Sequence, residues 1–373
     1  MKVLLLTTHL DMGGIPVYLV NLALGLKEHG HHPVILSSGG SLERRLVQEG
    51  IPHHRIDCRT SSELNPKLWL RAWPQLLWLI RREKPDLLHA HTRVTQILSW
   101  AAGLATRVSY LSTCHGLYRY RVGRRLMPCW GEPVIAISQA SLDCLVHQYR
   151  LAPPHQVALV WNGIDVGHFL QPPSEHQIRT FRENNGLWGE PVVGAVARLS
   201  PVKGLDFLLK AVPGLLKQFP NLQVLLVGDG PARADLVRLA YKLGIADRVV
   251  ISYPVEDIRV PLATLSAFLI PSLEEGFGLT AAEAMAAGVP VVASAIGGLS
   301  QIVEHGRTGL LTRPGDTQSI QEAVEQLLSD PQRRCEFAEA GRRAAQERFD
   351  LNRMVAQVED VYGRALNRHG KKT

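Results

Sequence analysis

The sequence predicts an α/β protein of two doubly wound domains, each built on a parallel sheet. Short apolar runs alternate with amphipathic helical patterns, which is typical of βαβ units. This alternation stops near residue 170 and then starts again. A chain of 373 residues also exceeds one ordinary hydrophobic core and suits two. We expect domains over 1–170 and 175–348, and a last helix within 349–373 that returns to the first domain.

In the first half, short apolar runs predict six strands, over Val3–Leu6, Pro33–Leu36, Leu87–His89, Val108–Thr113, Val134–Ile137 and Val157–Val160. Helical patterns lie between them, over Val17–Glu28, Leu42–Glu49 and Leu68–Arg82. The first apolar run ends after four residues, at Thr7. It is too short for a signal peptide and reads as a buried strand.

The second half repeats this pattern, with strands expected over Val192–Val196, Val224–Val227, Val249–Ile251, Phe268–Ile270 and Val291–Ala293. Helices are expected over Gly204–Gln218, Ala232–Leu243, Leu279–Ala287, Thr317–Leu328, Pro331–Phe349 and Leu351–Arg368. The join is expected at His168–Glu175, where Gln171-Pro172-Pro173-Ser174 has linker composition. Doubly wound sheets bind ligands at the carboxyl ends of their strands, so two facing sheets predict an active site in the cleft between them.

The composition is that of a globular protein, with 46% hydrophobic and 20% charged residues. Five cysteines without a C-x-x-C pair argue against a disulfide framework or a zinc site and favour a reducing, cytoplasmic compartment. No stretch of about 18 apolar residues predicts a membrane span. Residues 1–172 carry 18 Lys and Arg against 11 Asp and Glu, whereas the rest is balanced. The first half therefore has either an anionic partner or a solvated basic face.

The strongest motif runs from Pro271 to Pro290 as P-S-L-E-E-G-F-G-L-T-A-A-E-A-M-A-A-G-V-P. A predicted strand ends at Ile270, a glycine-bearing loop follows, and a helix starts whose free N–H groups suit a diphosphate. Glu275 precedes this helix and Glu283 lies inside it. Carboxylates beside a phosphate site suit the paired hydroxyls of sugars. The alternative is a capped helix with a solvated acid.

A second motif, V-A-R-L-S-P-V-K-G, follows the first strand of the second domain and carries Arg198 and Lys203. Two cations five residues apart across a turn can converge on two phosphates. They would stabilise the negative charge that develops on a leaving nucleoside diphosphate. The alternative is an Arg and Lys pair with a purely structural role.

These two motifs resemble those of the retaining glycosyltransferases of family GT4, whose fold is called GT-B and has two Rossmann-like domains. The resemblance implies that Glu275 binds hydroxyls of the donor sugar and that Glu283 binds the nucleotide ribose. It also implies catalytic roles for Glu275, Arg198 and Lys203, with Ala197 in place of the family's glycine. The remaining donor-binding residues that we predict lie in glycine-bearing turns, and they are Gly228, Gly276, Phe277, Gly278 and Leu279.

The first half carries further motifs of the family. Thr113-Cys114-His115-Gly116 resembles T-x-H-G/D, which implies that His115 is catalytic and contacts the donor sugar. Gly13 and Gly14 open a helix in a loop that lines the cleft in the family; a simple turn is the alternative. His89-Ala90-His91 places two side chains on one face, without a suitably spaced third metal ligand, and His91 is expected to face the ligand.

The segment Trp161-Asn162-Gly163-Ile164-Asp165 resembles the family's N-G-[IV]-D and makes Asn162 a candidate on the acceptor side. The sequence departs from the family pattern in three places, of which the first concerns a loop and its donor contact and the other two leave the nucleobase open. Ser300-Gln301 replaces Pro-Glu, Ala267 replaces an aspartate, and Ser252-Tyr253-Pro254-Val255 replaces a glycine-containing turn beside the base.

The sequence shows neither a D-x-D motif nor a carboxylate pair suited to double displacement. The resemblance implies a metal-independent reaction on one face of the sugar, in which the leaving phosphate receives the acceptor proton. We expect no cofactor, since the nucleotide-sugar is a co-substrate.

Two basic aromatic segments lie in the first half, Leu68–Arg82 with three Trp and Tyr118–Arg125. Trp with Arg suits the inner face of a membrane, whereas the same Trp side chains could instead pack on the sheet. Nucleic acid is not expected as a partner, because no nucleic-acid motif is present.

Together these features predict a retaining glycosyltransferase that moves a sugar from a nucleotide-diphospho-sugar, with a UDP-sugar as the expected donor. The expected acceptor is a glycan or lipid-linked compound of the cell envelope, such as lipopolysaccharide or exopolysaccharide. Two alternatives stay open. One is a nucleotide-sugar epimerase of the same fold, and the other is a sugar-nucleotide-binding protein without turnover.

Overall fold

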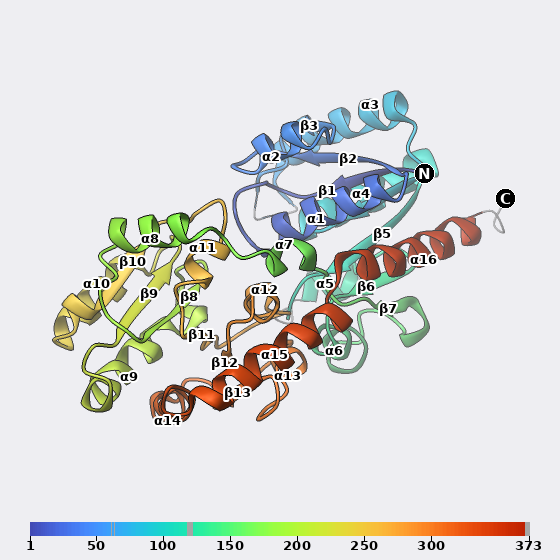
Figure 1. The fold of residues 1–373 in the computed structure, drawn as a ribbon. Coiled ribbons are helices and arrows are strands. Elements are labelled where there is room, and N and C mark those ends of the chain that lie inside the picture. Colours follow the sequence, from blue (N-terminus) through green and yellow to red (C-terminus); the bar gives the residue numbers. More distant parts are fainter. Residues whose placement is uncertain (61, 63, 118–121, 370–373) are drawn as a thin grey trace. The chain divides into compact units, whose positions relative to one another are not determined.

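The computed structural model describes residues 1–60, 62, 64–117 and 122–369 (Figure 1). The chain divides into two compact units. Unit 1 comprises Met1–Gly163 and Leu351–Thr373, and unit 2 comprises Ile164–Asp350. Each unit contains one parallel sheet with helices packed on it, which confirms the predicted fold class.

Unit 1 has a seven-stranded parallel sheet in the order β3-β2-β1-β4-β5-β6-β7. Its strands are β1 (Lys2–Leu6), β2 (His32–Ser37), β3 (His53–Arg55), β4 (Leu87–Ala90), β5 (Ser109–Cys114), β6 (Val134–Ala136) and β7 (Val157–Leu159). Its helices are α1 (Gly14–Glu28), α2 (Glu43–Gln48), α3 (Trp73–Glu83), α4 (Arg93–Thr106), α5 (Val122–Leu126), α6 (Gln139–Asp143) and α16 (Leu351–His369).

The core of unit 1 has two layers because successive side chains of a strand point to opposite faces. On β1, Val3 and Leu5 pack in a cluster with residues of α1 and α16. Leu4 and Leu6 pack in another cluster, with residues of α3 and α4. Both faces of the strand are therefore covered, which explains its continuous apolar sequence.

Unit 2 has a six-stranded parallel sheet in the order β10-β9-β8-β11-β12-β13. Its strands are β8 (Val192–Val196), β9 (Gln223–Val227), β10 (Val249–Ser252), β11 (Ala267–Ile270), β12 (Val291–Ser294) and β13 (Gly309–Thr312). Its helices are α7 (Val166–Leu170), α8 (Glu175–Asn184), α9 (Leu205–Gln218), α10 (Arg233–Lys242), α11 (Arg259–Leu262), α12 (Leu279–Ala286), α13 (Leu299–Ile302), α14 (Thr317–Ser329) and α15 (Pro331–Arg348). No helix in the described part of the chain combines the length and apolar character that crossing a bilayer requires.

Several elements were not expected from the sequence. Strand β3 has the polar sequence His-His-Arg and lies at the edge of its sheet, so it lacks the apolar run that marks a buried strand. Strand β13 is a four-residue edge strand that begins with glycine. Helix α8 has no fully buried residue and helix α4 follows β4 directly, and neither was among the expected helices.

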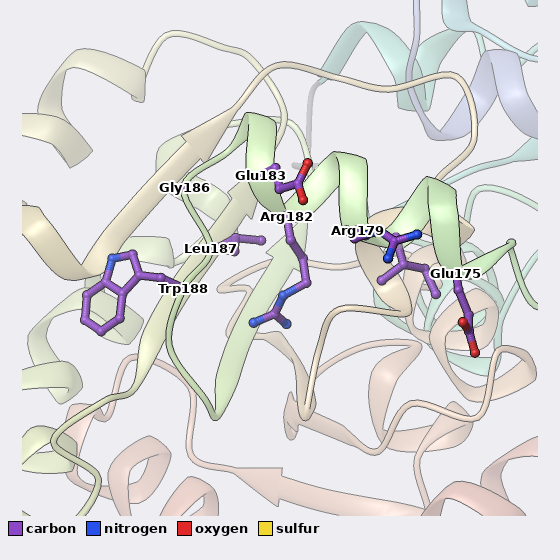
Figure 2. Close-up of a pocket in the computed structure, with 8 residues that line it drawn as sticks. Glu175, Arg179, Arg182, Glu183, Gly186, Leu187 and Trp188 are labelled. Carbon is purple, nitrogen blue, oxygen red and sulfur yellow. The ribbon is translucent and has the colours of Figure 1, made fainter.

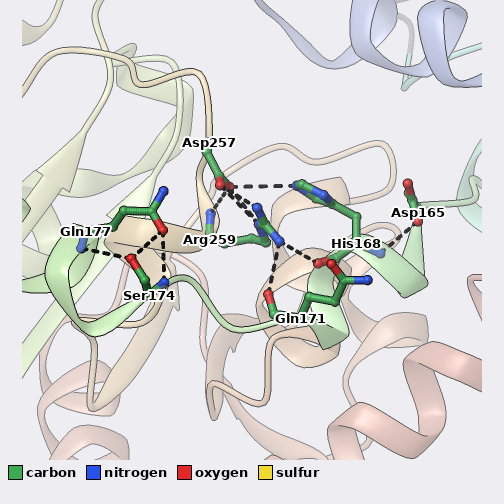
Figure 3. Close-up of polar contacts among 7 residues, drawn as sticks. All are labelled: Asp165, His168, Gln171, Ser174, Gln177, Asp257 and Arg259. Carbon is green, nitrogen blue, oxygen red and sulfur yellow. Dashed lines mark hydrogen bonds and ion pairs between the residues drawn. The ribbon is translucent and has the colours of Figure 1, made fainter.

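The segment after Gly163 belongs to unit 2, although the linker composition had placed the join at residues 168–175. Ile164 donates its N–H to the carbonyl of Phe349 at 2.8 Å, within unit 2. Arg259 then donates to the backbone carbonyls of His168 and Gln171 at 3.1 and 3.0 Å (Figure 3). These contacts hold the segment against unit 2, so its Pro-rich composition marks an ordered connection and not the boundary itself.

Asp257 orients the guanidinium that makes these contacts. Its carboxylate accepts from Arg259 Nη2 at 2.7 Å and from Nε at 2.9 Å, and His168 Nε2 lies 3.8 Å away (Figure 3). The hydrogen bonds from Arg259 hold the pKa of Asp257 below its usual range. Asp165 caps α7 by accepting from the His168 N–H at 2.9 Å.

We expect Arg259→Ala to lower the free energy of unfolding by about 1–3 kcal/mol, because it removes charge-assisted hydrogen bonds that are partly buried. Arg238→Ala is the matched control, since Arg238 pairs with Asp235 on an exposed surface of unit 2. The control should change stability by less than about 0.5 kcal/mol. Urea unfolding of the whole chain measures both, and equal losses would contradict the assigned role of Arg259.

The effect of Arg259→Ala should depend on pH. The pKa of Asp257 is lowered in the folded protein, so its contribution is complete above the unfolded value of about 3.9. The contribution is lost as the pH falls through the lower folded pKa. The stability difference between wild type and Arg259→Ala should therefore shrink on acidification below about pH 4.

Candidate active site

The first group of predicted residues lies where the strand order of unit 2 reverses. Strand β8 pairs with β9 on one side and with β11 on the other, so the loops that follow β8 and β11 leave the sheet next to each other. Ligands of doubly wound sheets bind at such a switch point, beyond the carboxyl ends of the strands. The loop after β8 carries Arg198 and Lys203, and the loop after β11 carries Glu275.

Lys203 and Glu275 meet across this switch point. Lys203 Nζ lies 2.6 Å from Glu275 Oε2, and both side chains are largely buried, at 23% and 14% exposure. Ser272 Oγ lies 3.4 Å from the same carboxylate oxygen. The residue predicted to bind the phosphates, Lys203, is therefore in direct contact with the residue predicted to bind the donor sugar, Glu275.

Two glycines allow the neighbouring loops to approach this closely. Gly204 follows Lys203 with φ +61°, and a Cβ there would lie 2.1 Å from the carbonyl oxygen of Pro271. Gly228 has φ +153°, and a Cβ there would lie 1.9 Å from the carbonyl oxygen of Ala197. Both positions therefore require glycine for packing between loops, independently of any ligand.

The other donor-side residues surround this pair. Arg198 is exposed and makes no hydrogen bond or ion pair with the described residues, so its guanidinium is available to an anion. Glu283 is buried on α12, at 7% exposure. Gly276 and Leu279 are partly exposed, at the end of the loop and the start of α12.

Phe277 and Gly278 anchor the loop that precedes α12. The ring of Phe277 is 4% exposed and packs edge-to-face on Phe349, with centroids 5.7 Å apart. Gly278 is the N-cap residue of α12 with φ +106°, and a Cβ there would lie 2.5 Å from the side chain of Leu299. The Phe277 side chain thus faces the core, which leaves its backbone for any contact with a donor.

Unit 1 has its own switch point, between β1 and β4. The loop after β1 holds Gly13 and Gly14, and His91 directly follows β4, where its N–H donates to the carbonyl of Leu6 at 2.9 Å. A Cβ at Gly13 would make only ordinary contacts, and a Cβ at Gly14 would meet no atom within 4 Å. Packing within the described part of unit 1 therefore does not explain these two glycines.

Three histidines gather at the carboxyl ends of β4 and β5. His91 Nδ1 lies 3.0 Å from Nε2 of His115, which follows β5. The ring of His89 lies 4.1 Å from that of His91, centroid to centroid. His89 contacts the hydroxyl of Tyr362 through Nδ1 at 2.8 Å and that of Thr113 through Nε2 at 2.7 Å. Among the described residues, no three His, Cys, Asp or Glu side chains are arranged to hold a metal ion.

The histidine cluster is neutral at neutral pH. Burial lowers the pKa of His115 to about 3 and places the pKa values of His89 and His91 well below the usual value. Burial also raises the pKa values of Tyr18 and Tyr362, so both phenols stay protonated. Removing these side chains from water penalises every charged form.

Sequence reasoning did not find Tyr18 and Tyr362 as part of this cluster. Tyr18 lies on α1 with its ring edge-on to His115, 4.7 Å between centroids, and Tyr362 reaches His89 from α16. Each is one apolar position of an amphipathic helix, so its local pattern indicates only burial. Asn162 is 3% exposed, and its Oδ1 has no hydrogen-bond partner among the described residues.

The three tryptophans of the basic segment divide between core and surface. Trp69 and Trp73 pack against the core of unit 1, whereas Trp78 is 55% exposed with Arg82 over its ring at 5.1 Å. Of the second basic segment, Tyr118, Arg119, Tyr120 and Arg121 lie outside the described residues.

The loop after β10, which departs from the family pattern, presents an exposed aromatic ring. Tyr253 is 65% exposed, and the Arg233 guanidinium lies 4.1 Å from its ring centroid. Arg233 is itself fixed by donating to the carbonyls of Gly228 and Ile251 at 3.1 and 2.7 Å. Ala267 is buried in β11, where an aspartate would be costly.

A pocket of about 460 Å³ lies elsewhere in unit 2, along α8 and the turn that follows it (Figure 2). Its lining residues are Glu175, Ile178, Arg179, Arg182, Glu183, Gly186, Leu187 and Trp188. None of them is among the predicted site residues.

Comparison with known proteins covers both units. Residues 12–168 match the family described as Glycosyltransferase Family 4, and residues 177–344 match Glycosyl transferases group 1. A D-inositol 3-phosphate glycosyltransferase of Xylanimonas cellulosilytica is 30% identical, over 96% of this chain and 93% of the relative. The N-acetyl-alpha-D-glucosaminyl L-malate synthase of Bacillus anthracis is 26% identical, over 96% of this chain and 95% of the relative.

A solved structure agrees with these relatives. Anabaena HepE in complex with UDP and glucose superposes with a TM-score of 0.84 at 25% identity, over 96% of this chain and 98% of that one. The two parallel-sheet units and this structural likeness show a GT-B fold, and the family matches to both halves show a glycosyltransferase. Given the matches to both halves, the chain belongs to glycosyltransferase family 4.

We expect Gly204→Ala to lower the free energy of unfolding by roughly 3–5 kcal/mol, because a left-handed backbone and a clash with Pro271 act together. Gly186→Ala is the matched control, since Gly186 has φ +62° and open space around its Cβ position. It should cost about 1–2 kcal/mol. Equal costs in urea unfolding would show that the two loops do not need their close approach.

Proposed function

We propose that the protein transfers a sugar from a UDP-sugar to a cell-envelope, lipid-linked or exopolysaccharide acceptor, with retention of configuration and without a metal ion. The contact between Lys203 Nζ and Glu275 Oε2, at 2.6 Å, carries this proposal. In the free protein the two side chains neutralise each other. A bound donor replaces both partners at once, since its diphosphate attracts the ammonium and its sugar hydroxyls donate to the carboxylate.

The remaining donor contacts follow from the same switch point. Arg198 has no competing partner among the described residues and is free to bind the diphosphate with its fork of N–H groups. The N-terminus of α12 presents free backbone N–H groups beyond Gly278. Glu283, on the same helix, is assigned to the ribose hydroxyls.

The likeness to a UDP-bound structure favours UDP as the nucleotide. The related HepE structure contains UDP and glucose, and it covers 96% of this chain. In this chain the exposed ring of Tyr253, backed by the fixed guanidinium of Arg233, offers a flat surface on which a base can stack. Stacking alone does not select among bases, so hydrogen bonds of the loop after β10 would supply the selection.

The reaction we propose needs no protein nucleophile. Arg198 and Lys203 stabilise the charge that builds up on the leaving diphosphate, and the leaving oxygen takes the proton from the acceptor hydroxyl on the same face of the sugar. His115 is neutral at neutral pH and serves as a hydrogen-bonding group toward the donor sugar, because its pKa of about 3 excludes a charged imidazolium.

Unit 1 is proposed to bind the acceptor, with Gly13 and Gly14 lining its site and the buried side chains of His91 and Asn162 supporting it. Residues 1–172 hold the whole excess of positive charge, which favours an acceptor with negative charge. Two relatives are named for anionic compounds, malate and inositol 3-phosphate. Their names are consistent with this charge preference.

Replacing Glu275 tests the donor site. Glu275→Gln should lower kcat/KM for transfer by about 10–100-fold, because hydrogen bonds to a charged group contribute roughly 1.5–3 kcal/mol. The neighbouring exposed Glu274→Gln is the control and should stay within about twofold. Transfer by the Glu275→Gln variant at the wild-type rate would refute the assignment.

Product analysis separates the proposal from its two alternatives. Incubation with a UDP-sugar and an acceptor should yield a glycoside with the anomeric configuration of the donor, at an equal rate with a metal chelator present. A free epimer without any glycoside would indicate an epimerase. Nucleotide-sugar binding without turnover would indicate a binding protein.

We also propose that unit 1 docks on an anionic membrane surface through one face of the segment Leu68–Glu83. The buried residues of this segment are Leu68, Ala72, Leu76, Leu79 and Ile80. The exposed residues of the segment are Leu70, Arg71, Pro74, Gln75, Trp78, Arg81 and Arg82, and Lys67 directly before it is exposed as well. Leu70 is 76% exposed, and this apolar side chain stands among cations, as interfacial helices arrange them.

Vesicle sedimentation tests this docking face. The full chain should bind vesicles that contain anionic lipid, and binding should weaken as salt rises, because the attraction is partly electrostatic. A Leu70→Ser/Trp78→Ser variant should bind about tenfold less tightly or worse, since each lost apolar side chain contributes roughly 1.5 kcal/mol or more. Val47→Ser, at a 78% exposed position on α2, should bind like wild type. Absence of binding by wild type would reject the docking face.

A further inference from the structure

The contact between His91 and His115 constrains where each imidazole carries its proton. His91 Nδ1 and His115 Nε2 lie 3.0 Å apart, at hydrogen-bond distance. Burial keeps both rings neutral at neutral pH, so each ring has one N–H group and one nitrogen lone pair. One ring must therefore donate to the other, and only two arrangements are possible.

The environment of His91 separates the two arrangements. His91 is 1% exposed, and its Nε2 has no hydrogen-bond partner among the described residues. If His91 accepted at Nδ1, its proton would have to lie on Nε2, where a buried N–H group would have no acceptor. If His91 donates from Nδ1, only a lone pair is left without a partner. Buried N–H groups without acceptors are the rarer of the two in proteins.

We propose that His91 is a positioning residue that donates its Nδ1–H to Nε2 of His115 and thereby holds His115 as the tautomer protonated on Nδ1. His115 then presents a neutral N–H donor at Nδ1, and this atom has no partner among the described residues. Its Nε2 lone pair is occupied and cannot take a proton from an acceptor. The tautomer follows from unit 1 alone, whereas its effect on catalysis rests on the proposed function.

The surrounding side chains keep the His91 ring in the orientation that this hydrogen bond needs. His89 lies against it at a centroid distance of 4.1 Å, and the ring of Tyr18 lies 5.7 Å away. His89 is in turn fixed at both nitrogens, by the hydroxyls of Tyr362 and Thr113. The orientation of His91 is thus linked to α16 through Tyr362.

Nitrogen NMR of the full chain tests the tautomer directly. Long-range ¹H–¹⁵N spectra of protein labelled with ¹⁵N-histidine distinguish protonated from unprotonated ring nitrogens at pH 7.5. The signals of His115 are those that disappear in His115→Asn. We expect its Nδ1 to be protonated and its Nε2 to be unprotonated. The opposite pattern would overturn the proposal, whatever the enzyme does.

Two substitutions of His91 test the consequence for the reaction. His91→Asn keeps an N–H donor near the position of Nδ1, so it should keep the fixed His115 tautomer and a higher kcat than His91→Phe. His91→Phe packs in the same space without a donor. It should lose the fixed His115 tautomer in the NMR spectrum and lower kcat about tenfold, the factor that one hydrogen bond of ordinary strength supplies.

The outcomes separate the two proposals. Transfer by His91→Phe at the wild-type kcat would overturn the positioning role. If His91→Phe does not fold, the wild-type spectrum and the activity of His91→Asn test the proposal instead. The opposite His115 tautomer in wild type would overturn the positioning role of His91. A folded but inactive His91→Asn variant would also overturn it. If His115→Asn transfers sugar normally while wild type shows the expected tautomer, the catalytic role of His115 in the proposed function fails and the tautomer stands.

Discussion

The parallel pairing of β8 with β11 is the constraint on which the donor side of the site depends. These strands are distant in sequence and adjacent in the sheet, so the loops that leave their carboxyl ends must run side by side. The backbone of Gly204 comes so close to Pro271 that no side chain fits between them. Lys203 and Glu275 are neighbours because the loops that carry them follow adjacent strands of the sheet.

The polar residues of the candidate site differ in charge between the two units. In unit 2 a Lys and a Glu form an ion pair, which suits a site that exchanges this internal contact for a charged ligand. In unit 1 the polar groups around His115 are deeply buried and neutral, although this half of the chain is the basic one. The positive charge lies on the surface, as on the exposed face of Leu68–Glu83, and not beside the histidines.

The sequence predicted those features that are encoded locally. Apolar runs marked the buried central strands, and the loop motifs marked Lys203, Glu275 and His115 because a strand, a turn and a helix follow one another within a few residues. Contacts between distant segments could not be predicted. Tyr362 and His89 are separated by 273 residues, and Arg259 holds a segment about 90 residues before it. Polar edge strands such as β3 were not predicted, because they bury too few apolar side chains to produce a periodic hydrophobic pattern in the sequence.

The position of α16 has a consequence for biosynthesis. Its side chains Val355, Val358 and Tyr362 belong to the core of unit 1, yet the ribosome makes them after the whole of unit 2. Residues 1–163 therefore lack the helix that covers part of their core while the next 187 residues are translated. Val3, Leu5 and Leu22 lie in the cluster that this helix completes, so the nascent chain keeps apolar surface open to chaperones until α16 has been made.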